Sequence, residues 1–142
     1  MPATFVHLRT HTEYSVVDGT LRVDDAVAAA ARDRQPACAI TDLSNLFGAV
    51  KFYSAARKAG VKPVVGCDLW IEPEPGRPAG DKQGSRLLVL VQDTRGYLNL
   101  CRLLAQAWTT NVQRAQAWVK WDWLQDQADG LLALSGADQG AV

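Results

Sequence analysis

The sequence predicts an α/β fold in which strands and helices alternate and the strands form a parallel sheet, open or closed into a barrel. Short apolar runs typical of strands alternate with segments whose apolar residues recur at helical spacing. The length of 142 residues, with 48% apolar and 21% charged residues, is typical of one ordinary globular domain.

The first expected strand is 5–10, in which alternate side chains face opposite ways. Four side chains are expected on one face, the last just beyond the strand: Phe5, His7, Arg9 and His11. A turn at Asp18-Gly19 follows.

A helix is expected near 22–34, with Thr20 as its N-cap. Asp24 and Asp25 would lie in its first turn, where carboxylates complement the helix dipole. Pro36 prevents the helix from continuing.

The middle of the chain then predicts a buried strand at 37–41 and a second helix at 46–59, stopped by Gly60. A strand is expected at 62–72. The segment 73–85 is rich in proline and glycine, so it is expected to be a loop.

The last third predicts a strand at 86–92, a helix at 94–109, a short helix near 119–127 and a strand at 131–135. The longer helix is expected to have an apolar face formed by Tyr97, Leu100, Cys101, Leu104 and Trp108. The sequence ends where another helix would follow the strand, so we expect this chain to be part of a longer protein.

Fifteen basic residues balance fifteen acidic ones, so no overall field attracts nucleic acid or a membrane surface. Binding to DNA would need a local patch, and one candidate is the stretch 94–121, which has no acidic residue. Its basic residues are Arg95, Arg102, Arg114 and Lys120, with Trp108 or Trp118 available for stacking. Their sparse spacing favours a solvated helix face. The tryptophans of WVKWDW, 118–123, are expected to pack within the chain rather than to form an interface.

Cys38, Cys67 and Cys101 are too widely spaced for a zinc knuckle and odd in number for a disulfide framework. Their apolar surroundings indicate buried thiols, and we expect a reducing cytoplasmic location. No apolar run approaches the ~20 residues of a membrane span, so no membrane partner is expected.

Four stretches carry a resemblance to a known family: HLRTHTEYSVVDG (7–19), AITDLSNLFGAVKFYSAARKAGVKPVVGCDLWIE (39–72), LLVLVQDTRGYLNL (87–100) and GLLALSG (130–136). Together they resemble the N-terminal PHP (polymerase and histidinol phosphatase) domain of bacterial DNA polymerase III alpha subunits. The resemblance implies an irregular β/α barrel, with residues 1–142 as about its first half. The remaining barrel and the polymerase domains would lie beyond this chain.

Metal-competent members of that family hold several ions with histidines and carboxylates at the ends of barrel strands. The resemblance places Arg9 and His11 at the first pair of histidine positions, with His7 one step too early to be a ligand. It places Asp18 and Asp68 at two acidic positions. Leu43 and Arg86 take the places of two further histidines.

We interpret this site as dismantled, with no catalytic or metal-binding residue. Arginine cannot lose its proton to become a ligand, and two fixed cations would repel a metal ion. His11, Asp18 and Asp68 remain as a vestige. We expect contacts of the type Arg9–Asp18 or Arg86–Asp68 to replace the ions; the alternative is that both arginines lie on the surface without a special role.

The resemblance implies a parent protein that carries out DNA-templated DNA synthesis, with Mg²⁺ in its separate polymerase domain and DNA as substrate. The PHP piece would need no cofactor. It would support the polymerase core of the same subunit and dock the proofreading exonuclease subunit, epsilon. The alternatives are a metal-dependent PHP phosphoesterase or 3′–5′ exonuclease that uses His11, Asp18 and Asp68, and a simple nucleic-acid-binding module.

Overall fold

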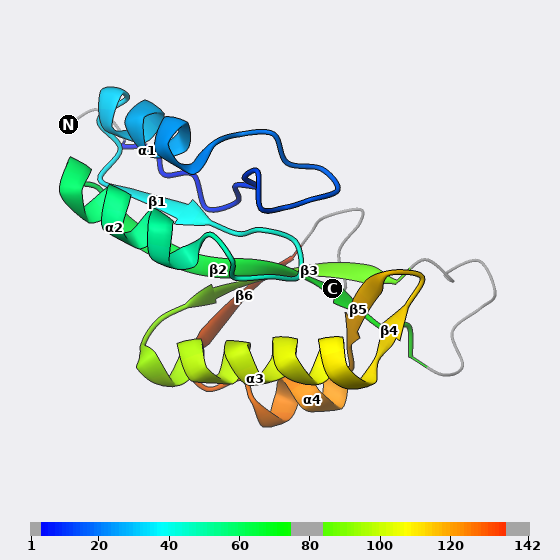
Figure 1. The fold of residues 1–142 in the computed structure, drawn as a ribbon. Coiled ribbons are helices and arrows are strands. Elements are labelled where there is room, and N and C mark those ends of the chain that lie inside the picture. The colour runs from blue at the N-terminus through cyan, green and yellow to red at the C-terminus, as the bar shows by residue number, and fades with distance from the viewer. Residues whose placement is uncertain (1–3, 75–83, 136–142) are drawn as a thin grey trace. The chain divides into compact units, whose positions relative to one another are not determined.

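The structure, a computed structural model, describes residues 4–74 and 84–135 (Figure 1). The chain separates into two compact units, Met1–Cys67 and Asp68–Val142, here called the N-terminal and C-terminal units. Most of the expected loop 73–85 lies outside the described residues. The alternation of helices and strands confirms the predicted α/β class.

The N-terminal unit is built from two helices and a parallel strand pair. Its elements are α1 (Val23–Arg32), β1 (Ala37–Ile40), α2 (Ala49–Ala59) and the first part of β2 (Lys62–Ile71). β1 pairs in parallel with β2, from Ala37 opposite Lys62 to Ile40 opposite Val65. A crossover helix, α2, joins the two strands, as parallel pairing requires.

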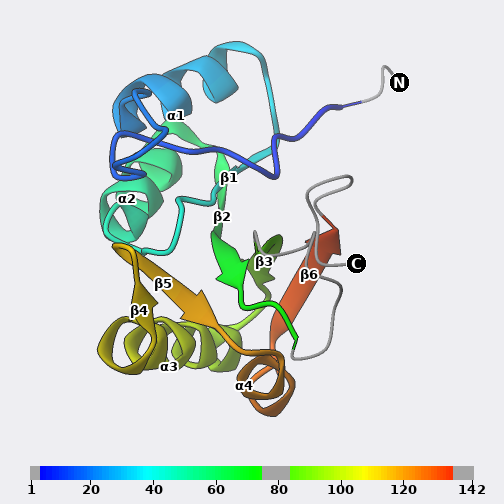
Figure 2. The same cartoon turned by 90° about the vertical axis from the view of Figure 1, so that its right-hand side faces the viewer.

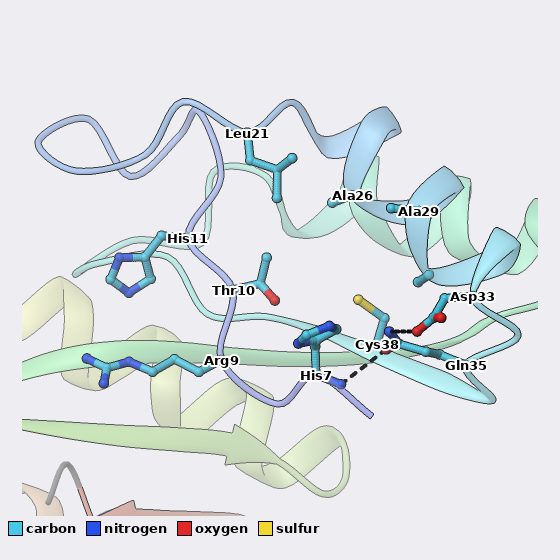
Figure 3. A pocket seen from close by; sticks show the side chains of 11 residues that line it. His7, Arg9, Thr10, His11, Leu21, Ala26, Ala29, Asp33, Gln35 and Cys38 are labelled. Carbon is cyan, nitrogen blue, oxygen red and sulfur yellow. Dashed lines mark hydrogen bonds between the residues drawn. The ribbon is translucent and has the colours of Figure 1, made fainter. Parts of the chain in front are cut away.

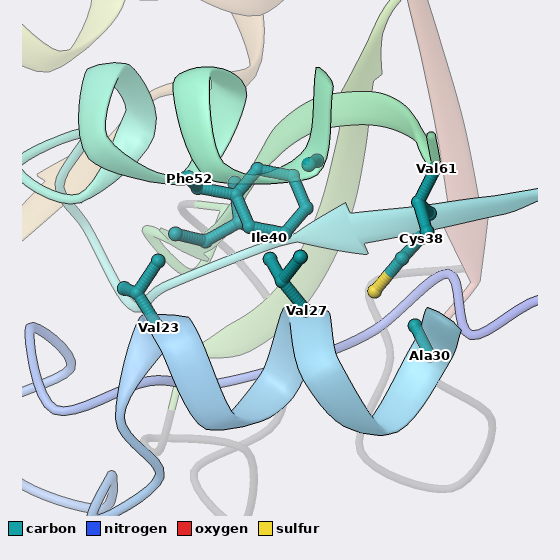
Figure 4. Packing of buried hydrophobic residues seen from close by; sticks show 8 residues of the cluster. Val23, Val27, Ala30, Cys38, Ile40, Phe52 and Val61 are labelled. Atoms are coloured by element: carbon teal, nitrogen blue, oxygen red, sulfur yellow. The ribbon is translucent and has the colours of Figure 1, made fainter. Parts of the chain in front are cut away.

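The core of the N-terminal unit lies between its helices and β1. Figure 4 shows Val23 and Val27 of α1 pointing toward Phe52 of α2 and Ile40 of β1. Val23 and Val27 are four residues apart, so they lie on one face of α1. The buried cluster consists of Val23, Val27, Ala30, Cys38, Ile40, Phe52, Ala56 and Val61.

The ends of both helices differ slightly from the sequence expectation. α1 begins at Val23 after Arg22, which makes no side-chain capping bond, so the prediction that Thr20 caps the helix was wrong; Asp24 and Asp25 do lie in its first turn. α2 begins at Ala49, three residues after the expected start, because Leu46 still belongs to the preceding turn.

The segment 5–10 is not a regular strand, contrary to the prediction. It does run beside β1, since Ala39 N–H donates to His7 O and Thr41 N–H to Thr10 O, both at 2.9 Å. The two acceptors are three residues apart and the two donors only two, so a regular ladder cannot form. The hydroxyl of Thr41, in place of a backbone oxygen, accepts from Thr10 N–H at 2.8 Å.

The C-terminal unit contains a mixed sheet and two helices. Its elements after β2 are β3 (Ser85–Val91), α3 (Thr94–Thr110), β4 (Val112–Gln113), β5 (Gln116–Val119), α4 (Trp121–Asp126) and β6 (Leu131–Ser135). The strand order is β4-β5-β2-β3-β6. β2 and β5 are parallel, but β3 and β6 pair antiparallel from Leu87 opposite Ser135 to Val91 opposite Leu131. The expectation that all strands are parallel was therefore wrong.

The hairpin of β4 and β5, visible beside α3 in Figure 2, was not expected. Its two-residue turn consists of Arg114 and Ala115, which have φ angles of 52° and 63°. Such turns favour Asn-Gly, because both central residues need positive φ. The sequence lacks this signal, so the hairpin could not be predicted.

These two strained residues lead to a prediction. Replacing Arg114-Ala115 by Asn-Gly should raise the free energy of unfolding by about 1 kcal/mol. Non-glycine residues at positive φ cost about 1–2 kcal/mol each, and the replacement relieves this cost. Part of the gain is offset because glycine loses more backbone entropy on folding. Urea unfolding would measure the change. Leu46→Gly, which creates an Asn-Gly pair with Asn45 outside the hairpin, should not stabilise the protein.

The buried face of α3 is rotated from the expected one. Leu100, Leu103, Leu104 and Ala107 are buried, whereas Tyr97 is 39% and Trp108 45% exposed. The helix begins with Asp93 as N-cap, whose carboxylate accepts from Gly96 N–H at 2.9 Å. Cys38 and Cys67 are buried as expected, and burial raises the pKa of the Cys38 thiol; Cys101 is half-buried.

Candidate functional site

A cluster of polar side chains lies where the loop 11–19 meets the residues that follow β1. We call it the polar cluster, and its members are His11, Thr12, Ser15, Asp18 and Asp42. Thr12, Ser15 and Asp42 are buried, with exposed fractions of 1%, 0% and 2%. Residues at the carboxyl end of a parallel strand are where α/β proteins usually place functional groups, so this cluster is the natural place to look for chemistry.

Asp42 is the most deeply buried carboxylate of the polar cluster. Thr12 binds both of its oxygens: the backbone N–H donates to Oδ1, and the hydroxyl donates to Oδ2 at 2.8 Å. Burial raises the pKa of Asp42, and the two bonds from Thr12 and the charge of His11 partly oppose this shift. Asp42 therefore holds the N-terminal segment against the end of β1.

Asp18 links the loop to the same region through one oxygen. Its Oδ1 lies 3.0 Å from His11 Nδ1 and accepts a hydrogen bond from the Ser15 hydroxyl at 2.7 Å. Ser15 Oγ in turn accepts from the backbone N–H of Leu43 at 3.2 Å. Two consecutive hydrogen bonds thus connect the backbone of Leu43 through Ser15 to Asp18.

Gly19 lets the loop close on itself. A Cβ atom at this position would lie 1.8 Å from the backbone oxygen of Thr12, which is too close for any side chain. The Gly19 N–H also donates to Ser15 O at 2.8 Å. The expected Asp18-Gly19 turn is therefore confirmed, and its glycine is required by close backbone approach.

The structure brings together only some of the residues singled out in the sequence. In the N-terminal unit His11 and Asp18 are in direct contact, and the backbone N–H of Leu43 is linked to Asp18 through Ser15. Arg9 and His11 point to the same side of their segment, away from His7 (Figure 3). The predicted Arg9–Asp18 contact stays a prediction.

Asp68 and Arg86 belong to the C-terminal unit. Asp68 is 1% exposed on β2. The guanidinium carbon of Arg86 lies 4.7 Å from the ring centroid of Trp70, a cation–π contact. The predicted Arg86–Asp68 contact also remains a prediction.

Sequence reasoning missed Asp42, Thr12 and Ser15 as members of the site. One signal was available: Thr41-Asp42 directly follows the buried strand β1, where a polar pair has to be satisfied by hydrogen bonds. Nothing in the sequence showed that Thr12, thirty residues earlier, would supply both donors.

The donor atoms of the polar cluster do not fit a multinuclear metal centre. Both oxygens of Asp42 are engaged by Thr12, Leu43 offers no side-chain donor, and Arg9 has no lone pair to give. Among the described residues, no three His, Cys, Asp or Glu side chains are grouped as ion ligands. In this arrangement Asp42 and Asp18 hold the loop 11–19 through hydrogen bonds from Thr12 and Ser15.

A separate cavity of about 490 Å³ lies between the segment 7–11 and α1 (Figure 3). Small side chains of α1, among them Ala26 and Ala29, form one wall. At one end Gln35 accepts from His7 N–H at 3.2 Å and donates to Asp33 at 2.9 Å. These polar groups satisfy one another, and the cavity presents no arrangement that defines a ligand.

The basic stretch 94–121 makes contacts within its own unit. Arg95 pairs with Asp129 at 3.6 Å, and Arg102 donates to Asn99 at 3.3 Å. Trp118 packs on Trp70 with ring centroids 5.4 Å apart. These contacts favour the interpretation that the stretch packs within the chain, and not that it forms a DNA-facing stripe.

The chain is similar to known proteins along its whole length. A family model described as the PHP domain matches residues 7–142. The chain belongs to the PHP domain family. The DNA polymerase III subunit alpha of Pseudomonas aeruginosa is 40% identical over 142 residues, and that of Escherichia coli K12 is 41% identical over 138. The PHP chain described here spans only 12% of the length of either relative.

Solved structures show the same fold at low identity. An amidohydrolase from Chromobacterium violaceum is 20% identical with a TM-score of 0.55, over 72% of this chain and 32% of that one. A protein from Bifidobacterium adolescentis described as a metal-dependent phosphoesterase is 18% identical with a TM-score of 0.52, over 75% of this chain and 34% of that one. This partial coverage is consistent with part of a PHP barrel. Within the described ranges, no helix is long and apolar enough to cross a membrane.

Proposed function

We propose that this chain is the N-terminal part of the PHP domain of a replicative DNA polymerase III alpha subunit located in the cytoplasm. The observation that carries the proposal is the similarity of about 40% to such subunits along the whole chain. The parent would extend DNA on a template, with Mg²⁺ bound in a polymerase domain outside these residues.

Within this parent, the PHP piece serves as a metal-free structural domain. The polar cluster supports this role because hydrogen bonds from Thr12 and Ser15 satisfy two carboxylates that metal ions would otherwise neutralise. The domain would support the polymerase core and dock the separate proofreading exonuclease subunit. A local site without catalytic groups is compatible with editing by a partner.

Restoring the lost ligands tests the metal-free role. The double variant Arg9→His/Leu43→His adds two imidazoles near His11 and Asp18, and we expect it to bind Zn²⁺ or Mn²⁺ at least about tenfold more tightly than the wild type. Isothermal titration of the full-length subunit would measure this affinity.

The matched control adds His11→Ala to the double variant and should abolish the gain, because a contact ligand is removed. Tight binding of these ions by the wild-type subunit itself would contradict the metal-free role. Equal affinity of the double variant and the wild type would show that positions 9 and 43 are not ligand positions.

The second candidate is a metal-dependent phosphoesterase or 3′–5′ exonuclease. The observation in its favour is the direct pairing of His11 with Asp18 at 3.0 Å, since both could act as ligands. Release of nucleotides from single-stranded DNA by the purified wild-type subunit, lost in Asp18→Ala, would establish it and displace the structural role.

A further inference from the structure

The short turn that leads into β6, residues 128–130, docks on the first turn of α3. The chain enters β6 directly after this turn, at Leu131. Gln92 N–H, from the residue that follows β3, donates to Gly130 O at 2.8 Å. The residue before β6 is therefore bonded to the residue after β3, and both belong to the C-terminal unit.

Side chains of α3 bind the same turn. Asn99, which is 7% exposed, donates from Nδ2 to Asp129 O at 2.9 Å. The guanidinium of Arg95 lies 3.6 Å from the Asp129 carboxylate, but both side chains of this pair are exposed, so it contributes little. The bond from Asn99 is thus the stronger side-chain link between α3 and the turn.

Two glycines allow the turn and the helix to approach this closely. A Cβ atom at Gly96 would lie 1.9 Å from Gly130 O, which is too close for any side chain. Gly130 has a φ of 79°, and a Cβ atom there would collide with Asp93 Oδ1 and with the Gly96 backbone. Both positions therefore require glycine. We use the name β6 latch for the contacts made by Gln92, Gly96, Asn99, Asp129 and Gly130.

The β6 latch accounts for a strand direction that β6 itself does not specify. The residues of β6, LLALS, do not distinguish parallel from antiparallel pairing. A strand that starts beside the last residue of β3 has to run back along it, so Leu131 lies opposite Val91 and Ser135 opposite Leu87. The place where the turn 128–130 is fixed therefore decides the direction of the strand.

We propose that the β6 latch is the device that fixes β6 in the sheet, because it holds the start of the strand at the end of β3 and so sets their antiparallel pairing. The inference does not depend on the activity of the parent protein, since each contact of the latch joins described residues of one unit. Opening the latch should release β6 while α3 stays in place, because α3 has a buried face of its own, formed by Leu100, Leu103, Leu104 and Ala107.

Hydrogen–deuterium exchange of the full-length protein that contains this chain, followed by mass spectrometry of peptides that cover β6, tests the latch. Gly130→Ala places a side chain inside the latch and should speed exchange of the β6 amides about tenfold or more, because local opening governs their exchange. Asn99→Ala removes one bond and leaves both glycines in place, so we expect a smaller increase of about threefold. In both variants, exchange in β5 and in the second half of α3 should change less than about twofold.

The matched control is Gly60→Ala. Gly60 also has a left-handed φ, 75°, but a Cβ atom there would meet nothing within 4 Å. The variant therefore strains the backbone to a similar degree without touching the latch, and it should change exchange of β6 less than about twofold.

Two results would overturn the inference. Exchange of β6 at the wild-type rate in both latch variants would mean that its pairing does not depend on the latch. Equal increases in β6 and β5 of Asn99→Ala would mean that the whole unit opens as one body and that the latch is not a separate device. If Gly130→Ala does not fold, Asn99→Ala decides between these results and the expected one.

Discussion

Phe52→Ala should lower the free energy of unfolding by about 3–5 kcal/mol, the usual cost of removing a buried aromatic ring. Phe52 is 1% exposed and lies in the cluster that joins α1, α2 and β1. Alanine would leave a cavity between Val27 and Ile40 that this small core cannot easily close. Urea unfolding followed by far-ultraviolet circular dichroism would measure the loss.

Val50→Ala is the matched control, because Val50 lies two residues earlier on α2 and is 75% exposed. It should change the free energy of unfolding by less than about 0.5 kcal/mol. Similar losses in the two variants would mean that the ring of Phe52 does not form the centre of this core.

Asp42→Ala should cost about 2–4 kcal/mol, because Thr12 would keep two buried donors without an acceptor, each at about 1–3 kcal/mol. Thr12 is 1% exposed, so water cannot replace the carboxylate without rearrangement. Asp42→Asn should cost clearly less, since its amide oxygen can still accept from the Thr12 N–H. Equal losses in the two variants would show that the bonds from Thr12 do not stabilise the fold.

The difference in stability between the wild type and Asp42→Asn should depend on pH. Burial raises the pKa of Asp42 in the folded state above its usual value near 4. A raised folded-state pKa means that the folded protein binds the proton more readily, so this contribution to stability is present at low pH and is lost as pH rises through the folded-state pKa. The wild type should therefore gain stability relative to Asp42→Asn as pH is lowered from neutrality toward 4. An unchanged difference would contradict a raised pKa.

Regular elements were predictable where the local signals were strong. Gly60 ended α2 as expected, with a left-handed φ of 75°, and strands β1, β2 and β3 lie within one or two residues of their predicted bounds. Strand direction was harder to predict. The residues of a short apolar strand such as β6 do not indicate whether it will pair parallel or antiparallel with its neighbour. The hairpin at Arg114-Ala115 was missed for a similar reason: tertiary contacts impose a backbone conformation that those residues do not favour.

The candidate site was predictable in its residue types but not in its contacts. A resemblance singled out His11 and Asp18 as separate members of a vestigial site, and the structure places them in direct contact. The binding of Asp42 by Thr12 depends on a close approach between segments thirty residues apart, which no local pattern encodes. Hydrogen bonds of this kind are a product of the fold, so the structure was needed to find them.

The two hydrogen bonds that connect residue 43 through Ser15 to Asp18 begin at a peptide N–H, not at a side chain. Any amino acid except proline carries that group, so mutation can exchange the side chain at this position freely while the loop keeps its anchor. Substitutions at position 43, histidine included, should therefore leave the loop tethered at Ser15.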